Sequence, residues 1–371
     1  MSTARPVAFY APLKSPNHPL PSGDRTMARL LMKALDRAGF RPELASELRS
    51  LDKAGDRQRQ EAIRQTAEDE ASRLIAHYRA LPESSRPRLW FTYHVYYKAP
   101  DWIGPRVAEA LGIPYAVAEG SRAAKRAGGP WALGHEGAEA ALDRADAVFV
   151  MTRHDREALE AARPDRQALI DLPPFLDLED WPAPEAIPSR ASEARLLTVA
   201  MMRPGDKLAS YRILAAALDA IAHLPWTLDI VGDGEARAEV ASLFAAHAHR
   251  VRFHGQMDSA GLRALYGSAD LFVWPAVNEA YGMVLLEAQA MGCPVVAGAY
   301  GGVASVVRHG ETGWLTTPGD AAAFSDAVAG LLRDRKRLLS LGLHACDFVR
   351  QERDLESAAL RLRHALDPLT R

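Results

Sequence analysis

The sequence predicts an α/β protein built from two doubly wound domains. Short apolar runs rich in Val, Ile and aromatic residues alternate with longer stretches of helical periodicity, which is typical of a parallel sheet covered by helices. The same scheme occurs once in each half of the chain. The length of 371 residues is about twice that of a usual domain. Two domains are therefore expected, with ligands at the carboxyl ends of the strands.

Each strand is assigned to an apolar run that turn residues bound on both sides. In the first half the strand candidates are residues 7–11, 43–46, 89–94, 114–119, 147–151 and 168–172. In the second half they are residues 196–200, 228–232, 251–254, 271–275, 294–297 and 314–316. Helices fit into the intervals, and the chain after the last strand is predicted to be helical to its end.

The stretch Asp171–Arg190 between the halves has the composition of a linker. It holds five prolines, two apolar anchors (Phe175 and Trp181) and no helical or alternating period. We therefore place one domain at 1–180 and the other at 181–350, with a C-terminal helix at 351–371 that packs back toward the first domain. A long surface loop within one domain is the alternative.

The composition argues against several function classes. Forty-five Lys+Arg against 47 Asp+Glu give a net charge of -2, so no overall field favours nucleic acid. The two cysteines, Cys293 and Cys346, form neither a disulfide framework nor a zinc cluster. No apolar stretch approaches the roughly 20 residues that span a bilayer. We expect a cytoplasmic protein with no nucleic-acid partner.

The most informative stretch is Leu271–Gly298, which predicts a strand, a loop, a helix and a strand. The loop carries Glu279 and the helix carries Glu287. Ionised carboxylates only accept hydrogen bonds, so these two suit sugar hydroxyls or a ribose diol. The helix is predicted to begin near Gly282, and the N–H groups of its first turn suit a diphosphate.

Two further features converge on the same edge of the predicted sheet. Arg203 and Lys207 are placed in the loop after the first strand of the second half, where cations would stabilise a diphosphate leaving group. Exposed loop charges are commonly only solvated, so their position at a strand end is what favours binding. Gly301 and Gly302 follow a later strand and form either a close approach to a ligand or simply a tight turn.

Two motifs are specific in combination. The first is PAVNEAYGMVLLEAQAMGCPVVAG, which contains Glu279 and Glu287, and the second is GGVASVVRHGETGWLTTPGD. Together they resemble the retaining glycosyltransferases of family 4, which have the GT-B fold of two Rossmann-like domains facing each other across a cleft. Weaker similarity extends over most of the chain through LDIVGDG, VRFHGQM, LPPFLD and SGDRTMARLLMKALDRAGF.

The resemblance implies that a sugar moves, with retention at the anomeric carbon, from a nucleotide-diphosphate sugar in the second domain to an acceptor in the first. Glu279 would contact the donor sugar and Glu287 the ribose. Arg203 and Lys207 would contact the phosphates. The other donor-binding positions implied are Gly23, Gly255, Gln256, Tyr281, Gly282, Met283 and Val284.

The sequence departs from the family pattern at two places. Arg203 and Lys207 are closer together by one residue than is usual. Where many members have a histidine at the end of a first-domain strand, this chain has Glu119, which either contacts the donor sugar or acceptor or is a capping or salt-bridging acid. His94 is the other catalytic candidate of the first domain, with a packed core histidine as the alternative.

No Asp-x-Asp triplet occurs in the sequence. We therefore expect no metal and no other cofactor, because a helix dipole and cations can stabilise the departing diphosphate instead.

A basic stripe recurs every fourth residue along the predicted first helix. It would contact anionic lipid headgroups or an acceptor phosphate, or it is a solvated helix face. The stripe comprises Arg25, Arg29, Lys33, Arg37 and Arg41.

An aromatic cluster surrounds the end of the third predicted strand. It would stack on a sugar ring or belong to the core, and core packing suits its first two members best. The cluster comprises Trp90, Phe91, Tyr93, Tyr96, Tyr97 and Trp102.

The sequence-based hypothesis is a cytoplasmic retaining glycosyltransferase, open to peripheral membrane association, with a saccharide, lipid-linked or small-molecule acceptor. The hinge between its domains would lie in Asp171–Arg190. Two alternatives remain on the same fold: a nucleotide-sugar epimerase and a nucleotide-sugar-binding protein without turnover.

Overall fold

The computed structural model describes residues 4–20, 22–184 and 193–370. They form two compact units: unit 1 spans 1–173 and 355–371, and unit 2 spans 174–354. The sequence-based divisions were 180/181 and 350/351. The shift has a physical cause, because the start of the proline-rich stretch packs in unit 2. Phe175 and Leu176 are buried there, and the Leu176 N–H donates to the Arg353 carbonyl at 2.8 Å. The expected linker residues 185–192 lie outside the described residues.

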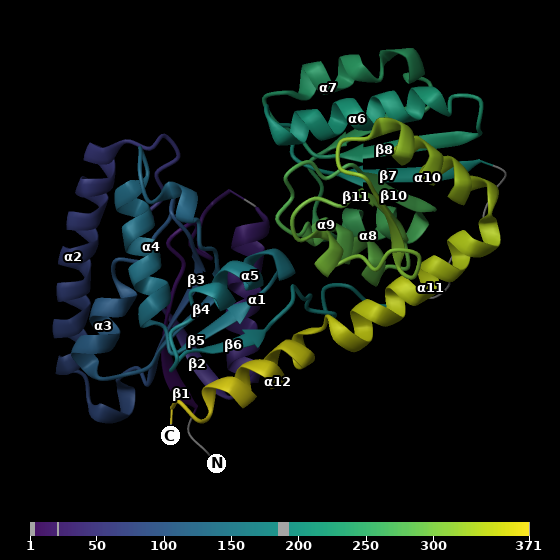
Figure 1. The fold of residues 1–371 in the computed structure, drawn as a ribbon. Helices are drawn as coiled ribbons and strands as arrows, with labels where there is room; N and C mark the ends of the chain where they lie inside the picture. The colour runs from purple at the N-terminus through teal and green to yellow at the C-terminus, as the bar shows by residue number, and fades with distance from the viewer. Residues whose placement is uncertain (1–3, 21, 185–192, 371) are drawn as a thin grey trace. The chain divides into compact units, whose positions relative to one another are not determined.

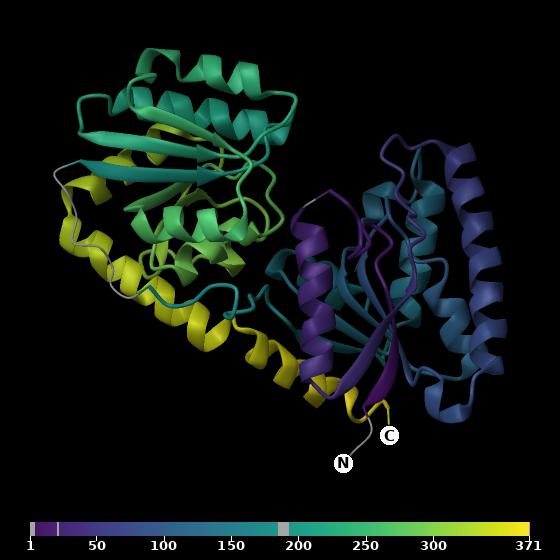
Figure 2. The same cartoon turned by 180° about the vertical axis from the view of Figure 1, so that it is seen from behind.

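Unit 1 is a six-stranded parallel sheet in the order β2-β1-β3-β4-β5-β6. Its strands are β1 (Arg5–Tyr10), β2 (Phe40–Ser46), β3 (Leu89–Val95), β4 (Tyr115–Gly120), β5 (Ala147–Val150) and β6 (Ala168–Asp171). Its helices are α1 (Gly23–Arg37), α2 (Arg57–Ala80), α3 (Gly104–Leu111), α4 (Ala132–Arg144), α5 (Arg153–Ala161) and α12 (Leu355–Leu366), with short 3₁₀ helices at Glu83–Ser85 and Ala124–Arg126. Helices α2, α3 and α4 cover one face of the sheet, and α1 and α5 cover the other (Figures 1 and 2).

The C-terminal helix α12 belongs to unit 1, where it packs beside α1 (Figure 1). The Arg363 guanidinium donates to the carbonyls of Arg37 and Ala38, both at 2.9 Å. Glu356 forms an ion pair with Arg37 at 3.1 Å. These contacts satisfy carbonyl groups at the end of α1 that have no partner within that helix.

Unit 2 is a second six-stranded parallel sheet, in the order β12-β11-β10-β7-β8-β9. Its strands are β7 (Ala194–Val199), β8 (Trp226–Val231), β9 (Val251–Gly255), β10 (Leu271–Trp274), β11 (Val295–Gly298) and β12 (Gly313–Thr316). Its helices are α6 (Asp206–Ala220), α7 (Arg237–Leu243), α8 (Ser259–Ser268), α9 (Met283–Ala290), α10 (Ala321–Arg333) and α11 (Arg335–Glu352), with 3₁₀ turns at Ala245–His247 and Val303–Ser305. Each strand candidate from the sequence has a counterpart, so the predicted α/β class with two doubly wound sheets is confirmed.

The strand order reverses once in each sheet. In unit 1 the chain places β2 on one side of β1 and β3 to β6 on the other, so the reversal lies between β1 and β3. In unit 2 it lies between β7 and β10, and Leu196 of β7 pairs with both Leu228 of β8 and Leu271 of β10. At such a switch point the loops after the two central strands diverge to opposite faces and leave a crevice for a ligand.

Close backbone packing at the carboxyl end of β8 depends on two glycines. Gly232 has φ +136°, and a Cβ on it would lie 1.9 Å from the Ala200 carbonyl oxygen. Gly234 has φ +151°, and its Cβ would lie 2.3 Å from the Met202 oxygen. The GDG part of LDIVGDG therefore lets the loop after β8 pack against the loop after β7.

We predict that Gly232→Ala destabilises unit 2 by more than about 1 kcal/mol, because the new methyl group would overlap a backbone oxygen and the backbone angle disfavours side chains. The control is Gly330→Ala in α10, where a Cβ meets nothing within 4 Å. Urea unfolding followed by tryptophan fluorescence compares the two variants. Equal midpoints would contradict the close-packing assignment.

Candidate functional site

An ion pair at the switch point of unit 2 joins the start of α6 to the loop after β10. Lys207 lies in the first turn of α6 and not in the preceding loop, which corrects its expected position. Its ammonium group pairs with the Glu279 carboxylate in the loop after β10. The indole N–H of Trp274 points to the same carboxylate at 3.4 Å, and the Lys207 Nζ lies 5.5 Å from the Trp274 ring centroid. Two residues predicted separately from the sequence thus meet at one point.

The loop between β10 and α9 is held in a strained conformation by contacts with α6. Ala276 and Asn278 have positive φ values of 58° and 48°. The Asn278 side chain donates to Asp206 at 3.0 Å, and the Val277 N–H donates to the Ser210 hydroxyl at 2.9 Å. Left-handed backbone at non-glycine residues costs about 1–3 kcal/mol each and concentrates at functional sites. These contacts therefore fix where the Glu279 carboxylate lies.

The glycine pair after β11 packs against this loop. Gly301 has φ +46°, and a Cβ on it would lie 2.5 Å from the Glu279 carbonyl oxygen. The Gly302 N–H donates to the Ala280 carbonyl at 2.6 Å. The glycine pair therefore allows the chain's own loop around Glu279 to approach closely, a partner that was not predicted from the sequence.

The first turn of α9 has no side-chain cap. Gly282 occupies the N-cap position with φ +73°, and no side chain hydrogen-bonds to the helix start. Tyr281 and Met283 are buried and Val284 is half-buried. Backbone N–H groups at a helix N-terminus attract anions, so this turn suits a phosphate group.

Glu287 lies one turn further along α9 and is half-buried. The Tyr266 hydroxyl of α8 donates to its carboxylate at 3.1 Å. Burial raises the pKa of Glu287 to about 7, and the bond from Tyr266 opposes that rise. Glu287 is therefore close to half-ionised at neutral pH, and a ligand that hydrogen-bonds to the carboxylate would favour the charged form.

The remaining donor-binding candidates lie at strand ends, apart from Gly23. Arg203 is exposed after β7, contacts the Met201 sulfur and has no acidic partner among the described residues. Gly255 ends β9 with φ +70°, and its carbonyl accepts from the Gly232 N–H at 2.8 Å. Gln256 follows it and is exposed. Gly23 belongs to unit 1, where it begins α1 after the N-cap Ser22, and a Cβ there would meet nothing within 4 Å.

In unit 1 the catalytic candidates His94 and Glu119 meet at the carboxyl ends of β3 and β4. The His94 Nδ1 lies 3.5 Å from the Glu119 Oε1 and 3.2 Å from the Asp24 Oδ1. Asp24 is in the first turn of α1 and was not among the predicted site residues. The sequence feature that could have identified Asp24 is its position in the first turn of the helix that follows the first strand.

Both catalytic candidates of unit 1 have left-handed backbone. His94 has φ +65° and Glu119 has φ +60°. Within the described residues, only Ala276 and Asn278 share this property among residues other than glycine. All four residues lie at the carboxyl ends of strands. His94 and Glu119 are near the ends of β3 and β4, and the other two follow β10. Strained backbone of this kind concentrates at functional sites.

The charges around His94 hold it in the protonated form. Burial alone would lower the pKa of His94, but the carboxylates of Glu119 and Asp24 outweigh it and raise that pKa to about 9. Burial raises the pKa of Glu119, which the His94 charge opposes. Burial alone would raise the pKa of Asp24, but the hydrogen bond to His94 and the His94 charge outweigh it and lower that pKa. His94 is thus an imidazolium at neutral pH, able to donate from its ring nitrogens and unable to act as a base.

Local partners occupy most of the basic stripe on and after α1. Arg25 donates to the carbonyls of His18 and Pro19, and Arg29 donates to that of Pro16 at 2.7 Å. The partner of Arg37 is Glu356, and that of Arg41 is Glu43. Lys33 also has a partner. Among the helices of the described residues, none has the length and apolar character needed to cross a bilayer.

Part of the chain is similar in sequence to known glycosyltransferases. Residues 193–334 match the family model described as Glycosyl transferases group 1. The chain is 40% identical over 120 residues to the phosphatidyl-myo-inositol mannosyltransferase of Mycobacterium leprae (31% of this chain, 32% of that protein). It is 32% identical over 237 residues to D-inositol 3-phosphate glycosyltransferase 2 of Catenulispora acidiphila (57% and 53%). The aligned segments thus span about a third to a half of these relatives.

Solved structures share the fold over nearly the whole chain. Sucrose-phosphate synthase from Thermosynechococcus elongatus matches with a TM-score of 0.75 at 22% identity, covering 98% of this chain and 99% of that one. The Anabaena protein HepE, solved in complex with UDP and glucose, matches with a TM-score of 0.69 at 16% identity, covering 98% and 100%. The expected GT-B fold is confirmed.

We predict that His94 titrates near pH 9, well above the usual value of about 6.5. Because the pKa is raised by folding, the stabilisation is complete below about pH 6.5 and is lost as the pH rises through 9. NMR titration of the histidine ring protons measures this midpoint, with His94→Gln assigning the signal. Asp24→Asn should lower the midpoint because one of the two facing carboxylates loses its charge. A wild-type midpoint at or below 6.5 would contradict the assignment.

Proposed function

We propose that the chain is a glycosyltransferase using a nucleotide-diphosphate sugar, because residues 193–334 match the model of the glycosyl transferases group 1 family and the chain has the GT-B fold. Transfer proceeds with retention at the anomeric carbon and without a metal. Unit 2 binds the donor, and unit 1 contacts a saccharide, lipid-linked or small-molecule acceptor.

The observation that carries this proposal is the meeting of Lys207 and Glu279 at the switch point of unit 2, beside the uncapped start of α9. A cation and a helix N-terminus neutralise a diphosphate, and a carboxylate accepts hydrogen bonds from sugar hydroxyls. The nearby Glu287 accepts from a ribose diol. Along the loop and helix the proposed contacts run from the sugar at Glu279 through the diphosphate at the start of α9 to the ribose at Glu287. This is the order in which a nucleotide sugar presents these groups.

The proposed step breaks the bond between the anomeric carbon and the diphosphate oxygen. The electron pair goes to the diphosphate, whose growing charge is stabilised by Lys207, Arg203 and the first turn of α9. An acceptor hydroxyl forms the new bond on the same face, and its proton goes to the departing phosphate oxygen. The protein chiefly positions the reactants, which accounts for much of the barrier lowering in such reactions.

The charges of the His94 cluster in unit 1, which comprises His94, Glu119 and Asp24, indicate its role. His94 is protonated at neutral pH, so we assign it to donate a hydrogen bond to a sugar or acceptor oxygen. Glu119 accepts from a hydroxyl group, and Asp24 holds His94 in its charged form. The names of the relatives refer to inositol phosphate and phosphatidylinositol, and an acceptor with several hydroxyl groups suits this cluster.

We predict that Glu287→Gln lowers affinity for the nucleotide sugar about tenfold, because a charged acceptor of ribose hydrogen bonds is lost. Wild-type affinity should also rise as the pH passes through about 7, where Glu287 ionises, whereas the variant should be flat across this range. Isothermal titration with an intact nucleotide sugar avoids the terminal phosphate of a free nucleoside diphosphate, which titrates near the same pH. Unchanged affinity in Glu287→Gln would refute the ribose role.

Glu119→Gln is expected to leave nucleotide-sugar affinity within about twofold and to reduce sugar transfer or acceptor-free hydrolysis at least about tenfold. Chelation of metals with EDTA should not change the wild-type rate. Chromatography of the incubated nucleotide sugar identifies the product. An isomerised nucleotide sugar would show an epimerase instead, and an unchanged one after long incubation with acceptors would show a binding protein without turnover.

A further inference from the structure

We propose that a second site on unit 1 binds the phosphate group of a phosphorylated polyol or sugar. The site, called here the cationic platform, consists of the rings of Tyr97 and Trp131 and the charged ends of Lys98 and Arg126. Assigning this ligand as the acceptor rests on the proposed function. The binding of the phosphate itself does not.

The two cations share the same pair of aromatic rings. Tyr97 and Trp131 meet edge to face, with ring centroids 5.9 Å apart. The Lys98 Nζ lies 5.6 and 5.3 Å from the two centroids, and the Arg126 guanidinium carbon lies 5.2 and 5.0 Å from them. The two positive charges are therefore no farther apart than about 10 Å, the Debye length at about 0.1 M salt, and they repel each other. An anion held between them would remove that repulsion.

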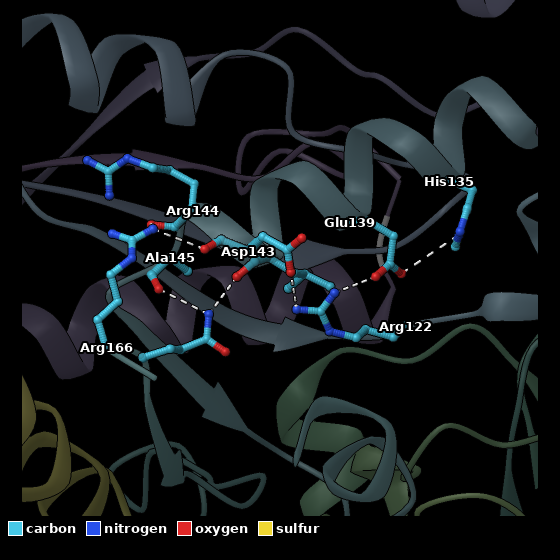
Figure 3. Close-up of polar contacts among 9 residues, drawn as sticks. Arg122, His135, Glu139, Asp143, Arg144, Ala145 and Arg166 are labelled. Carbon is cyan, nitrogen blue, oxygen red and sulfur yellow. Dashed lines mark hydrogen bonds and ion pairs between the residues drawn. The ribbon is translucent and has the colours of Figure 1, made fainter. Parts of the chain in front are cut away.

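Neither cation of the platform has an acidic partner among the described residues. The Arg126 Nε is in addition buried without a hydrogen-bond acceptor. Arg122, in the same loop, shows the contrast: its guanidinium pairs with Glu139 and with Asp143 of α4 (Figure 3). The Arg122 Nε is also buried without an acceptor, so the two arginines differ in their carboxylate partners and not in their Nε groups. The loop is thus anchored by an arginine paired with two carboxylates and presents another with no carboxylate partner among the described residues.

Buried polar residues fix the backbone around the platform. Asp52 and Gln60 are both buried. The Asp52 N–H donates to the Lys98 carbonyl at 2.9 Å, and its own carbonyl accepts from the Trp131 indole at 3.3 Å. The Gln60 side chain donates to the Pro130 carbonyl at 2.8 Å. Such a network holds the rings and cations in place before a ligand arrives, which lowers the entropy lost on binding.

Ring contacts connect the platform to the His94 cluster. His94 and Tyr96 have ring centroids 5.0 Å apart, and Tyr96 and Tyr97 have centroids 5.5 Å apart. His94, Tyr96, Tyr97 and Trp131 are all half-buried, so this row of rings is partly exposed to solvent. A polyol ring lying over Tyr96 and Tyr97 would direct its phosphate to Lys98 and Arg126 and a hydroxyl group toward His94. This places the phosphate and the reacting hydroxyl at opposite ends of one acceptor.

The test is calorimetric titration of the full chain with glucose 6-phosphate, glucose and inorganic phosphate, and sedimentation with phosphatidylcholine vesicles that do or do not contain phosphatidylinositol. We expect glucose 6-phosphate or the phosphatidylinositol vesicles to bind at least about tenfold more tightly than the neutral counterpart, with Lys98→Gln and Arg126→Gln each removing about tenfold. Binding in solution identifies a small phosphorylated ligand, and binding only on vesicles identifies a lipid headgroup.

The matched control is Lys125→Gln, which removes an exposed cation beside Arg126 that lies over no ring. Equal losses for Lys125→Gln and Arg126→Gln would overturn the proposal by showing general charge attraction, as would the absence of any phosphate preference in both arms. Nucleotide-sugar affinity, measured on the same variants, should stay at the wild-type value. If the wild-type chain binds a nucleotide sugar but no phosphorylated ligand, this site is refuted and the proposed function stands. If it binds the phosphorylated ligand but no nucleotide sugar, the proposed function is refuted and the site stands.

Discussion

The reversal of strand order is the constraint on which both candidate sites depend. In unit 1 it separates the loops after β1 and β3, and in unit 2 the loops after β7 and β10. Each gap is bridged by one acid–base pair, Asp24 with His94 in unit 1 and Lys207 with Glu279 in unit 2. Parallel strands buried on both faces can carry few polar groups, so the functional side chains lie at the carboxyl ends of the strands or in the loops and helices that follow them. The two pairs hold opposite charges together at partly exposed positions, where they can exchange partners with a polar ligand.

The rest of each unit keeps these loops in conformations that they would not adopt alone. The positive φ angles of His94 and Glu119 aim neighbouring side chains at each other, and those of Ala276 and Asn278 shape the loop that carries Glu279. Compensation comes from packing. Gly301 admits the Glu279 backbone, and α6 accepts or donates hydrogen bonds along the loop. Local strain is thereby maintained by contacts that belong to the scaffold.

The sequence alone predicts the fold well, because strands of a parallel sheet appear as continuous apolar runs and the intervening helices as a different period. It also marks Glu279, Glu287 and Lys207, which stand in specific motifs or beside strand ends. It does not reveal that Lys207 and Glu279 meet, since that contact depends on which strands become neighbours. Nor does it reveal Asp24, which helps to raise the pKa of His94, or Tyr266, which opposes the rise in the pKa of Glu287. An acid in a first helical turn and a buried tyrosine usually have ordinary structural roles.

We propose that the switch point of unit 2 binds a nucleotide sugar through the loop of Glu279 and the start of α9. The most direct test is a crystal structure of the chain with the nucleotide sugar selected by a thermal-shift screen. We expect the diphosphate within hydrogen-bond distance of the backbone N–H groups of Met283 and Val284 and of the Lys207 ammonium, with the ribose diol on Glu287. A nucleotide bound away from the carboxyl ends of β7 and β10, or one with its ribose directed away from Glu287, would contradict it.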